Sequence, residues 1–135
     1  MLRVLIADDD RDAVLTLGIL LRSEGYDVRL ARSGKEAMSQ ALELRPDIAL
    51  LDLQMPDYSG LRVARDLQRH YGGDCPLLIA VTGRTQDRQT AQMSGFHHFV
   101  AKPYDPIALL RLLDQSRISA STSFVSSTSD SCQPR

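Results

Sequence analysis

Three consecutive carboxylates, Asp8, Asp9 and Asp10, directly follow an apolar run at the start of the chain. Crowded like charges repel, by roughly 1 kcal/mol per pair in bulk water and about 4 kcal/mol at the effective dielectric near a protein surface. A hard divalent cation would relieve this repulsion. Mg²⁺ fits best because it takes oxygen ligands, keeps several waters and is commonly shared between carboxylates and phosphate. The cluster therefore predicts a Mg²⁺ site that needs a further acid from elsewhere in the chain.

Three more side chains with suitable chemistry stand at the ends of apolar segments: Asp52, Thr82 and Lys102. If these segments are neighbouring parallel strands, their carboxyl ends meet at one edge of a sheet, where ligands bind in open α/β folds. A carboxylate there can act as a nucleophile and form an aspartyl-phosphate, while a hydroxyl and an ammonium group can hold phosphoryl oxygens. Because positioning and charge neutralisation supply most of the catalysis of phosphoryl transfer, this set predicts a phosphoryl-transfer site.

Each of these residues also has a plainer interpretation when it is taken alone. The acids at 8–10 would suit the N-terminus of a helix, where the helix dipole stabilises negative charge, and we expect Asp10 to be such a cap. Thr82 alone would more often hydrogen-bond to backbone, and Lys102 alone would more often be a solvated charge. The functional interpretation therefore depends on the joint occurrence of the set.

Five short apolar segments alternate with helix-length amphipathic segments, a pattern typical of βα units that build a parallel sheet. Three of the expected strands are almost continuously apolar, which indicates burial on both faces, whereas the second alternates polar and apolar residues and suits a sheet edge. The expected strands are residues 2–7, 26–31, 47–51, 77–81 and 97–101, and the expected helices are residues 12–24, 34–44, 59–71, 86–94 and a fifth that begins at Asp105-Pro106.

The helix expected over residues 86–94 differs from the other four because it has only Ala91 and Met93 as apolar anchors. The others repeat apolar residues at helical spacing, and the one at 34–44 opens with the Ser33-x-x-Glu36 spacing of a capping box. Few apolar side chains remove little area from water. We therefore expect the helix at 86–94 to be weakly held.

The composition limits the class of protein. The chain has 135 residues, 43% hydrophobic and 24% charged, which suits one folded domain, and its net charge of −1 argues against nucleic-acid binding through a basic surface. No apolar run approaches the ~20 residues of a membrane span, and two cysteines are too few for a disulfide framework. We therefore expect a soluble cytoplasmic protein with no membrane association and no direct nucleic-acid binding. After a folded domain at 1–117, the Ser/Thr-rich segment 118–135 is expected to be a flexible tail or linker stub.

Four motifs taken together resemble the receiver domain of two-component response regulators: DDD at 8–10, PDIALLDLQMP at 46–56, VTG at 81–83 and FVAKPYD at 99–105. The resemblance covers residues 1–117. It implies a flavodoxin-like, doubly wound α/β sandwich with a five-stranded parallel sheet in the order 2-1-3-4-5 and five helices. It also implies a phosphoacceptor that assists its own phosphorylation and dephosphorylation rather than a turnover enzyme.

The resemblance assigns a role to each acidic residue of the candidate site. Asp52 would accept a phosphoryl group from a phosphohistidine on a sensor histidine kinase or a histidine phosphotransfer protein. Asp9 and Asp52 would coordinate Mg²⁺ directly together with the backbone carbonyl of Gln54. Asp8 would assist through water.

On the same resemblance, Lys102 would pair with the phosphoryl oxygens and Thr82 would move toward them. Phe99 would be the switch whose ring turns inward after Thr82 has shifted. The fourth helix, the fifth strand and the fifth helix would form the surface that contacts a downstream protein target, and a homodimer through this surface is left open. The segment 95–106 is more similar to receivers of hybrid sensor kinases than to those attached to DNA-binding domains, and a single-domain receiver is the alternative.

Three other functions compete with this interpretation. A haloacid-dehalogenase-like phosphohydrolase also uses a strand-end aspartate and Mg²⁺, but that family needs a second aspartate two residues after the nucleophile, where this chain has Gln54. A dinucleotide-binding oxidoreductase needs G-x-G-x-x-G after the first strand, where this chain has three aspartates. A phosphorylation-independent docking module would not need the complete set of acids, hydroxyl and ammonium group.

Overall fold

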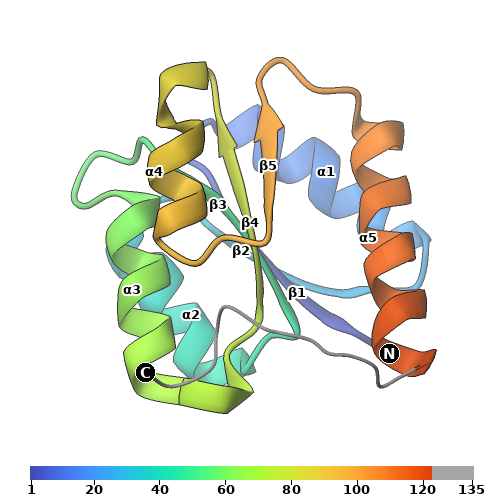
Figure 1. Cartoon of the computed structure of the whole chain (residues 1–135). Helices are drawn as coiled ribbons and strands as arrows, with labels where there is room; N and C mark the ends of the chain where they lie inside the picture. The colour runs from blue at the N-terminus through green and yellow to red at the C-terminus, as the bar shows by residue number, and fades with distance from the viewer. Residues whose placement is uncertain (123–135) are drawn as a thin grey trace.

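The computed structural model describes the backbone of residues 1–122 and the side chains of residues 1–116. In this part of the chain five strands form one parallel sheet in the order β2-β1-β3-β4-β5, as predicted (Figure 1). The strands are β1 (Arg3–Ala7), β2 (Asp27–Ala31), β3 (Ile48–Asp52), β4 (Leu77–Thr82) and β5 (His98–Ala101). The alternating strand β2 lies at an edge of the sheet, which confirms its predicted position.

Five α-helices in the described residues cover the two faces of the sheet. Helices α2, α3 and α4 lie on one face and helices α1 and α5 on the other (Figure 1), which makes the doubly wound, flavodoxin-like sandwich. The helices are α1 (Arg11–Ser23), α2 (Gly34–Leu44), α3 (Gly60–Tyr71), α4 (Arg88–Met93) and α5 (Pro106–Thr122), and two 3₁₀ turns are η1 (Gly72–Asp74) and η2 (Thr85–Asp87).

Two hydrophobic clusters, one on each side of the sheet, hold the three layers together. On one side α1 and α5 contribute Val14, Leu17, Leu21, Leu109 and Leu113. On the other side α2 and α3 contribute Ala37, Ala41, Val63, Ala64 and Leu67. Strands between two such clusters bury both faces, which explains the continuous apolar runs of β1, β3 and β4.

The fourth helix differs in part from its prediction. The segment expected to be helical at 86–94 begins as the turn η2, and neither η2 nor α4 has a side-chain cap. Ala91 is 1% exposed and anchors the helix, but Met93 is 79% exposed, so the expectation that it anchors the helix is wrong. A residue two positions on points about 200° further round a helix, so a helix that buries Ala91 must expose Met93.

The C-terminal helix continues past the position where the folded domain was expected to end. Helix α5 runs to Thr122, whereas the expected boundary is residue 117. Residues 123–135, which make up most of the expected Ser/Thr-rich tail, lie outside the described residues. The flexibility of that tail stays a prediction.

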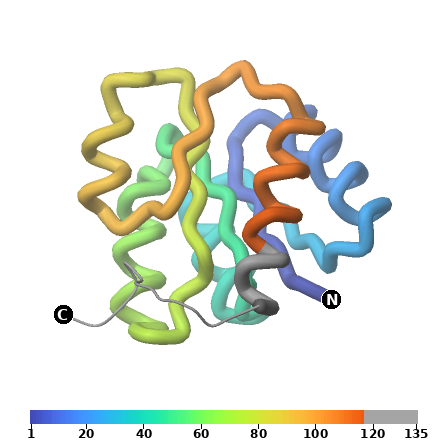
Figure 2. Tube along the Cα trace, turned by 45° about the vertical axis from the view of Figure 1, so that its right-hand side comes forward, coloured from blue at the N-terminus to red at the C-terminus, as the bar shows by residue number. Residues whose placement is uncertain are grey.

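The loops that follow β1, β3, β4 and β5 emerge at the same end of the molecule (Figure 2). Strands β1 and β3 are neighbours and pair Ala7 with Leu51, so the residues that follow these two positions are adjacent. The first loop is short because α1 begins at once. The Asp10 carboxylate accepts hydrogen bonds from the N–H groups of Asp12 and Ala13, which confirms Asp10 as the predicted helix cap.

Candidate functional site

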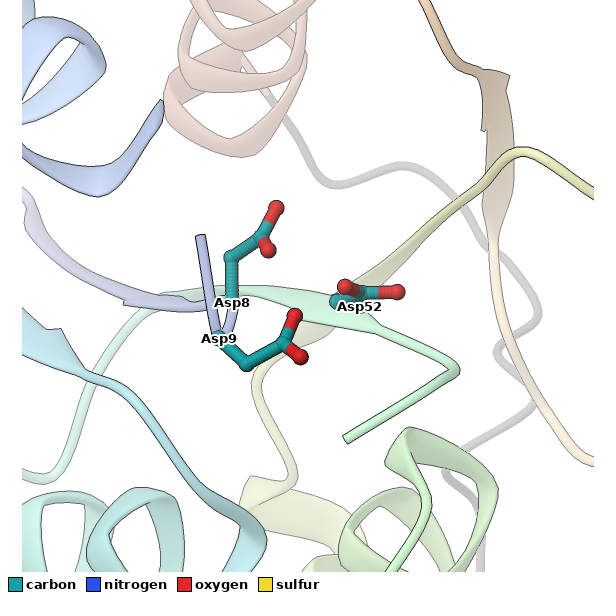
Figure 3. Close-up of side chains that lie close together, drawn as sticks. All are labelled: Asp8, Asp9 and Asp52. Carbon is teal, nitrogen blue, oxygen red and sulfur yellow. The ribbon is translucent and has the colours of Figure 1, made fainter. Parts of the chain in front are cut away.

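The three acids that were expected to meet do so at the ends of β1 and β3. One carboxylate oxygen from each of Asp8, Asp9 and Asp52 lies within 4.8 Å of the others. Figure 3 shows these three side chains side by side, with Asp8 and Asp9 following β1 and Asp52 ending β3. Asp8 and Asp52 are buried, at 4% and 3% exposure, whereas Asp9 is exposed. Solvent therefore reaches the cluster from the side of Asp9.

Lys102, which follows β5, reaches the two buried acids. Its Nζ lies 2.9 Å from Asp8 Oδ2 and 3.1 Å from Asp52 Oδ2. The backbone N–H of Lys102 also donates to the carbonyl oxygen of Thr82 at 2.8 Å, which extends the pairing of β4 and β5 to this loop. The ammonium group thus bridges the ends of β1 and β3 from a third strand.

The other oxygen of each buried carboxylate is held by the backbone that follows it. The N–H of Asp10 donates to Asp8 Oδ1 at 3.0 Å, and the N–H of Gln54 donates to Asp52 Oδ1 at 2.9 Å. Each Oδ1 is therefore fixed by its own loop, and each Oδ2 faces the shared ammonium group of Lys102. This leaves both carboxylates in a defined orientation before any ligand binds.

The electrostatics of the site show an incompletely compensated negative charge. Burial raises the pKa of the Asp52 carboxyl, and the neighbouring charge of Asp8 adds to this rise. Hydrogen bonds from the Gln54 N–H and from Lys102 oppose the rise, and the net pKa of Asp52 is about 6. Burial would lower the pKa of Lys102, but its hydrogen bonds to the two carboxylates outweigh this effect and raise the pKa. The two carboxylates therefore stabilise the positive charge of Lys102, but this single ammonium group does not fully neutralise the negative charge of both carboxylates.

This donor set fits Mg²⁺. Three carboxylates offer hard oxygen ligands, one of them exposed, and the excess negative charge is what a divalent cation would neutralise. Among the described residues, no other group of three or more His, Cys, Asp or Glu side chains is close enough to hold a metal ion. The expected ligand Gln54 has an exposed side chain and lies two residues beyond Asp52, so that its carbonyl group belongs to the same loop.

Thr82 and Phe99, the expected switch residues, lie on β4 and β5. Thr82 is fully buried at the end of β4, and its Oγ1 accepts a hydrogen bond from the N–H of Arg84 at 3.1 Å. Phe99 is half-buried on β5 and packs against the cluster on the α4 side of the sheet. The guanidinium carbon of Arg88 lies 5.3 Å from the centroid of the Phe99 ring.

Two residues next to the site have roles that the sequence analysis missed. Arg88, the first residue of α4, covers the Phe99 ring. Asp57 accepts hydrogen bonds from the N–H groups of Gly34 and Lys35, both at 2.7 Å, and thereby joins the loop after β3 to the start of α2. The position of Asp57, an acid in the short loop after the candidate nucleophile, was a signal in the sequence. Its partner Gly34 could not be identified in this way, because it lies 23 positions away.

A family model described as the response regulator receiver domain matches residues 4–114. The DNA-binding response regulator MtrA of Mycolicibacterium smegmatis is 38% identical over 108 residues, which are 80% of this chain and 47% of that protein. The chain thus spans about half the length of the curated MtrA relatives that it matches. Segment 95–106 was expected to be more similar to receivers of hybrid sensor kinases, whereas this relative is a DNA-binding response regulator.

Solved structures share the fold. A CheY-like response regulator receiver domain protein from Methanospirillum hungatei superposes with a TM-score of 0.79 at 25% identity, over 86% of this chain and 93% of that chain. The response regulator protein TrrA from Thermotoga maritima, solved in complex with Mg²⁺-BeF, gives a TM-score of 0.76 at 26% identity, over 85% of this chain and 98% of that chain. In the part of the chain that the structure describes, no helix has the length and apolar character needed to cross a membrane.

Proposed function

Because this chain belongs to the response regulator receiver domain family, we propose that Asp52 accepts a phosphoryl group from a phosphohistidine on a sensor histidine kinase or a histidine phosphotransfer protein. The observation that carries the proposal is the position of the Lys102 ammonium group, 2.9 Å from Asp8 and 3.1 Å from Asp52. A carboxylate nucleophile, acids for a metal and a cation for phosphoryl oxygens thus stand in direct contact. These are the parts that phosphoryl transfer needs.

In the proposed reaction an oxygen of Asp52 attacks phosphorus, and a P–O bond forms as the P–N bond to the imidazole breaks. The imidazole nitrogen keeps the electron pair of the broken bond. The Gln54 N–H orients the attacking carboxylate, and Lys102 is placed to accompany the transferred oxygens. Held by Asp9, Asp52 and the Gln54 carbonyl, with Asp8 assisting through water, Mg²⁺ would neutralise charge on those oxygens.

Thr82 and Phe99 are the proposed switch. The transferred group adds about −1.5 to −2 charges and three strong acceptor oxygens. These oxygens would compete with the present arrangement of the Thr82 hydroxyl, which accepts from the Arg84 N–H. Movement of Thr82 would make room for the Phe99 ring, and the changed surface of α4, β5 and α5 would bind a downstream protein target or a second copy of the chain.

Amide NMR of the full chain tests the proposal with beryllofluoride, a phosphoryl analogue, at saturating Mg²⁺. We expect shifts at the strand ends and across α4, β5 and α5 in the wild type. Asp52→Asn should abolish them because the acceptor oxygen is lost, and EDTA should abolish them because the acids then carry uncompensated charge. Mass spectrometry after incubation with a small phosphodonor should show one added phosphoryl group only when Asp52 is present.

Asp66→Asn is the matched control, since it makes the same chemical change on α3, where Asp66 pairs with Arg62 at 3.8 Å. It should respond like the wild type. Equal behaviour of wild type and Asp52→Asn would refute the phosphoacceptor function and would favour a docking module that does not depend on phosphorylation.

A further inference from the structure

Helix α4 is attached to the rest of the domain by different contacts at its two ends. At the C-terminal end, the Gln68 side chain of α3 donates a hydrogen bond to the Ser94 carbonyl oxygen at 2.7 Å. At the N-terminal end, where no side chain caps the helix, Arg88 lies over the ring of Phe99 on β5. Arg88 therefore connects the start of α4 directly to the proposed switch residue.

The contact between Arg88 and Phe99 has the geometry of a cation–π interaction. The distance of 5.3 Å from guanidinium carbon to ring centroid is within the range of about 6 Å over which a ring quadrupole attracts a cation. The neighbouring Arg84 is paired with Asp87 at 3.6 Å, whereas no carboxylate lies within ion-pair distance of Arg88 among the residues that the structure describes. The ring is thus the partner that the Arg88 guanidinium contacts here.

This contact stabilises only one position of the ring. The attraction exists while the ring face lies under the guanidinium group, and it is lost if the ring turns into the interior. A contact present in one of two states shifts the equilibrium toward that state. It therefore opposes the movement that phosphorylation is proposed to cause.

We propose that Arg88 is a positioning residue that holds Phe99 in its half-buried position and so sets the threshold for activation. This inference rests on the proposed function, because it needs Phe99 to move when Asp52 is modified. Loss of the contact raises the population of the binding-competent state, and the apparent affinity for a phosphoryl analogue rises by the same factor. The known strength of exposed cation–π pairs corresponds to a change of about two- to fivefold.

The test is a titration of the full chain with beryllofluoride at fixed Mg²⁺, followed by amide NMR. Arg88→Gln should lower the concentration at half-conversion about two- to fivefold. The direction is informative, because removing a cation near the site would by itself weaken binding of an anion and raise that concentration. The half-conversion concentration of Arg88→Lys should lie between those of the wild type and Arg88→Gln, since an ammonium group keeps the charge but stacks less well on a ring.

Two further variants separate the ring contact from other effects. Arg65→Gln removes an exposed arginine of α3 that makes no ring contact among the described residues, and it should leave the titration unchanged. In a Phe99→Leu background, Arg88→Gln should have no effect, because there is no ring to hold. Hydrogen exchange should become faster at residues 85–90 in Arg88→Gln, while the melting temperature stays close to that of the wild type.

An unchanged or raised half-conversion concentration in Arg88→Gln, with a normal wild-type response, would overturn the role of Arg88 alone. The role would also be overturned if Arg88→Gln changed the half-conversion concentration by the same factor in the Phe99→Leu background. If the wild type itself gives no response that depends on Asp52 and Mg²⁺, both this inference and the proposed function fail. The wild-type titration therefore distinguishes the two failures.

Discussion

Two loops at the same end of the sheet differ in how they are attached to the neighbouring helices. The loop at residues 53–59 after β3, here called the acceptor loop, is fixed to α2 because Asp57 accepts two backbone hydrogen bonds of 2.7 Å from the start of that helix. The loop at residues 83–87 after β4, here called the reporter loop, contains η2, which has no side-chain cap. The first loop carries the candidate metal ligand, and the second leads into the proposed output surface.

The space around three glycines shows the same difference between the two loops. A Cβ added at Gly34 would lie 2.5 Å from the Tyr58 carbonyl oxygen, and one added at Gly60 would overlap the carbonyl oxygen of Asp52. A Cβ added at Gly83 would meet nothing within 4 Å. The acceptor loop is therefore packed against α2 and α3 with no room for a methyl group at Gly34 or Gly60, whereas Gly83 of the reporter loop borders open space.

Under the proposed function, this difference between the loops would let one small domain combine phosphoryl transfer with signalling. Transfer to Asp52 needs an acceptor held in a fixed orientation, because small displacements of reacting groups slow a reaction strongly. A change of surface needs an element whose opening requires little free energy, which means few buried contacts. If the proposed function holds, adjacent strands meet these two requirements: the loop after β3 is tied to α2 by the Asp57 hydrogen bonds, and the segment after β4 has no side-chain cap.

The largest expected effect is that of Gly60→Ala, which adds a methyl group where α3 packs against the acceptor loop. The new methyl group meets backbone atoms of Asp52 and Leu53, which cannot rotate away. We expect the free energy of unfolding to fall by about 1–3 kcal/mol, the usual range for overpacking. Chemical denaturation measures this loss, and the beryllofluoride titration should also weaken because Asp52 shifts.

Gly83→Ala is the control, since it adds the same methyl group to the reporter loop. The change should alter the free energy of unfolding by less than about 0.5 kcal/mol, because the site is exposed and open. Equal losses in the two variants would show that the loops are packed alike and would remove the comparison.

A smaller effect is expected for Asp57→Asn, which loosens the acceptor loop without overpacking it. Slight desolvation raises the pKa of Asp57, but hydrogen bonds from backbone N–H groups outweigh it and lower the pKa from 3.8 to about 2. A lowered pKa means that ionised Asp57 stabilises the fold in full above pH 3.8 and loses this effect as the pH falls through about 2. The variant should therefore be less stable than the wild type at neutral pH, and the two should converge toward pH 2.

Thermal unfolding across pH 2 to 7 measures this convergence. Asp27→Asn, the same change at an exposed position of edge strand β2, is the control and should stay close to the wild type at neutral pH. A constant difference between Asp57→Asn and the wild type at every pH would contradict a role for the Asp57 charge.

The smallest and most local effect is expected for Gln68→Ala, which alters the attachment of α4 to α3. The variant removes the hydrogen bond to the Ser94 carbonyl oxygen. A net contribution of about 1 kcal/mol corresponds to about fivefold faster hydrogen exchange across residues 88–95, with amides of β1 and β3 unchanged. Gln89→Ala, on an exposed position of α4, should leave exchange as in the wild type. Wild-type protection in α4 equal to that of β1 and β3 would show that α4 is not weakly held.

Much of the architecture could be predicted from local patterns. The sequence pattern placed all five strands within one residue of their observed ends. For β1, β3 and β4 the reason is that a strand buried on both faces must be apolar at nearly every position. The cap at Asp10 was also predicted, since its partners are the next residues of the same helix. The exposure of Met93 was not, because the pattern of a six-residue helix does not tell which side faces the sheet.

That acids, a hydroxyl and a lysine stand at strand ends could be read from the sequence, because side-chain chemistry and segment order follow directly from the chain. Only the packed structure shows that one ammonium group is shared by Asp8 and Asp52, that Asp57 joins the acceptor loop to α2, and that Arg88 covers Phe99. Each of these contacts joins residues from separate strands, loops or helices. Their distances depend on how layers pack and loops close, which no local periodicity encodes.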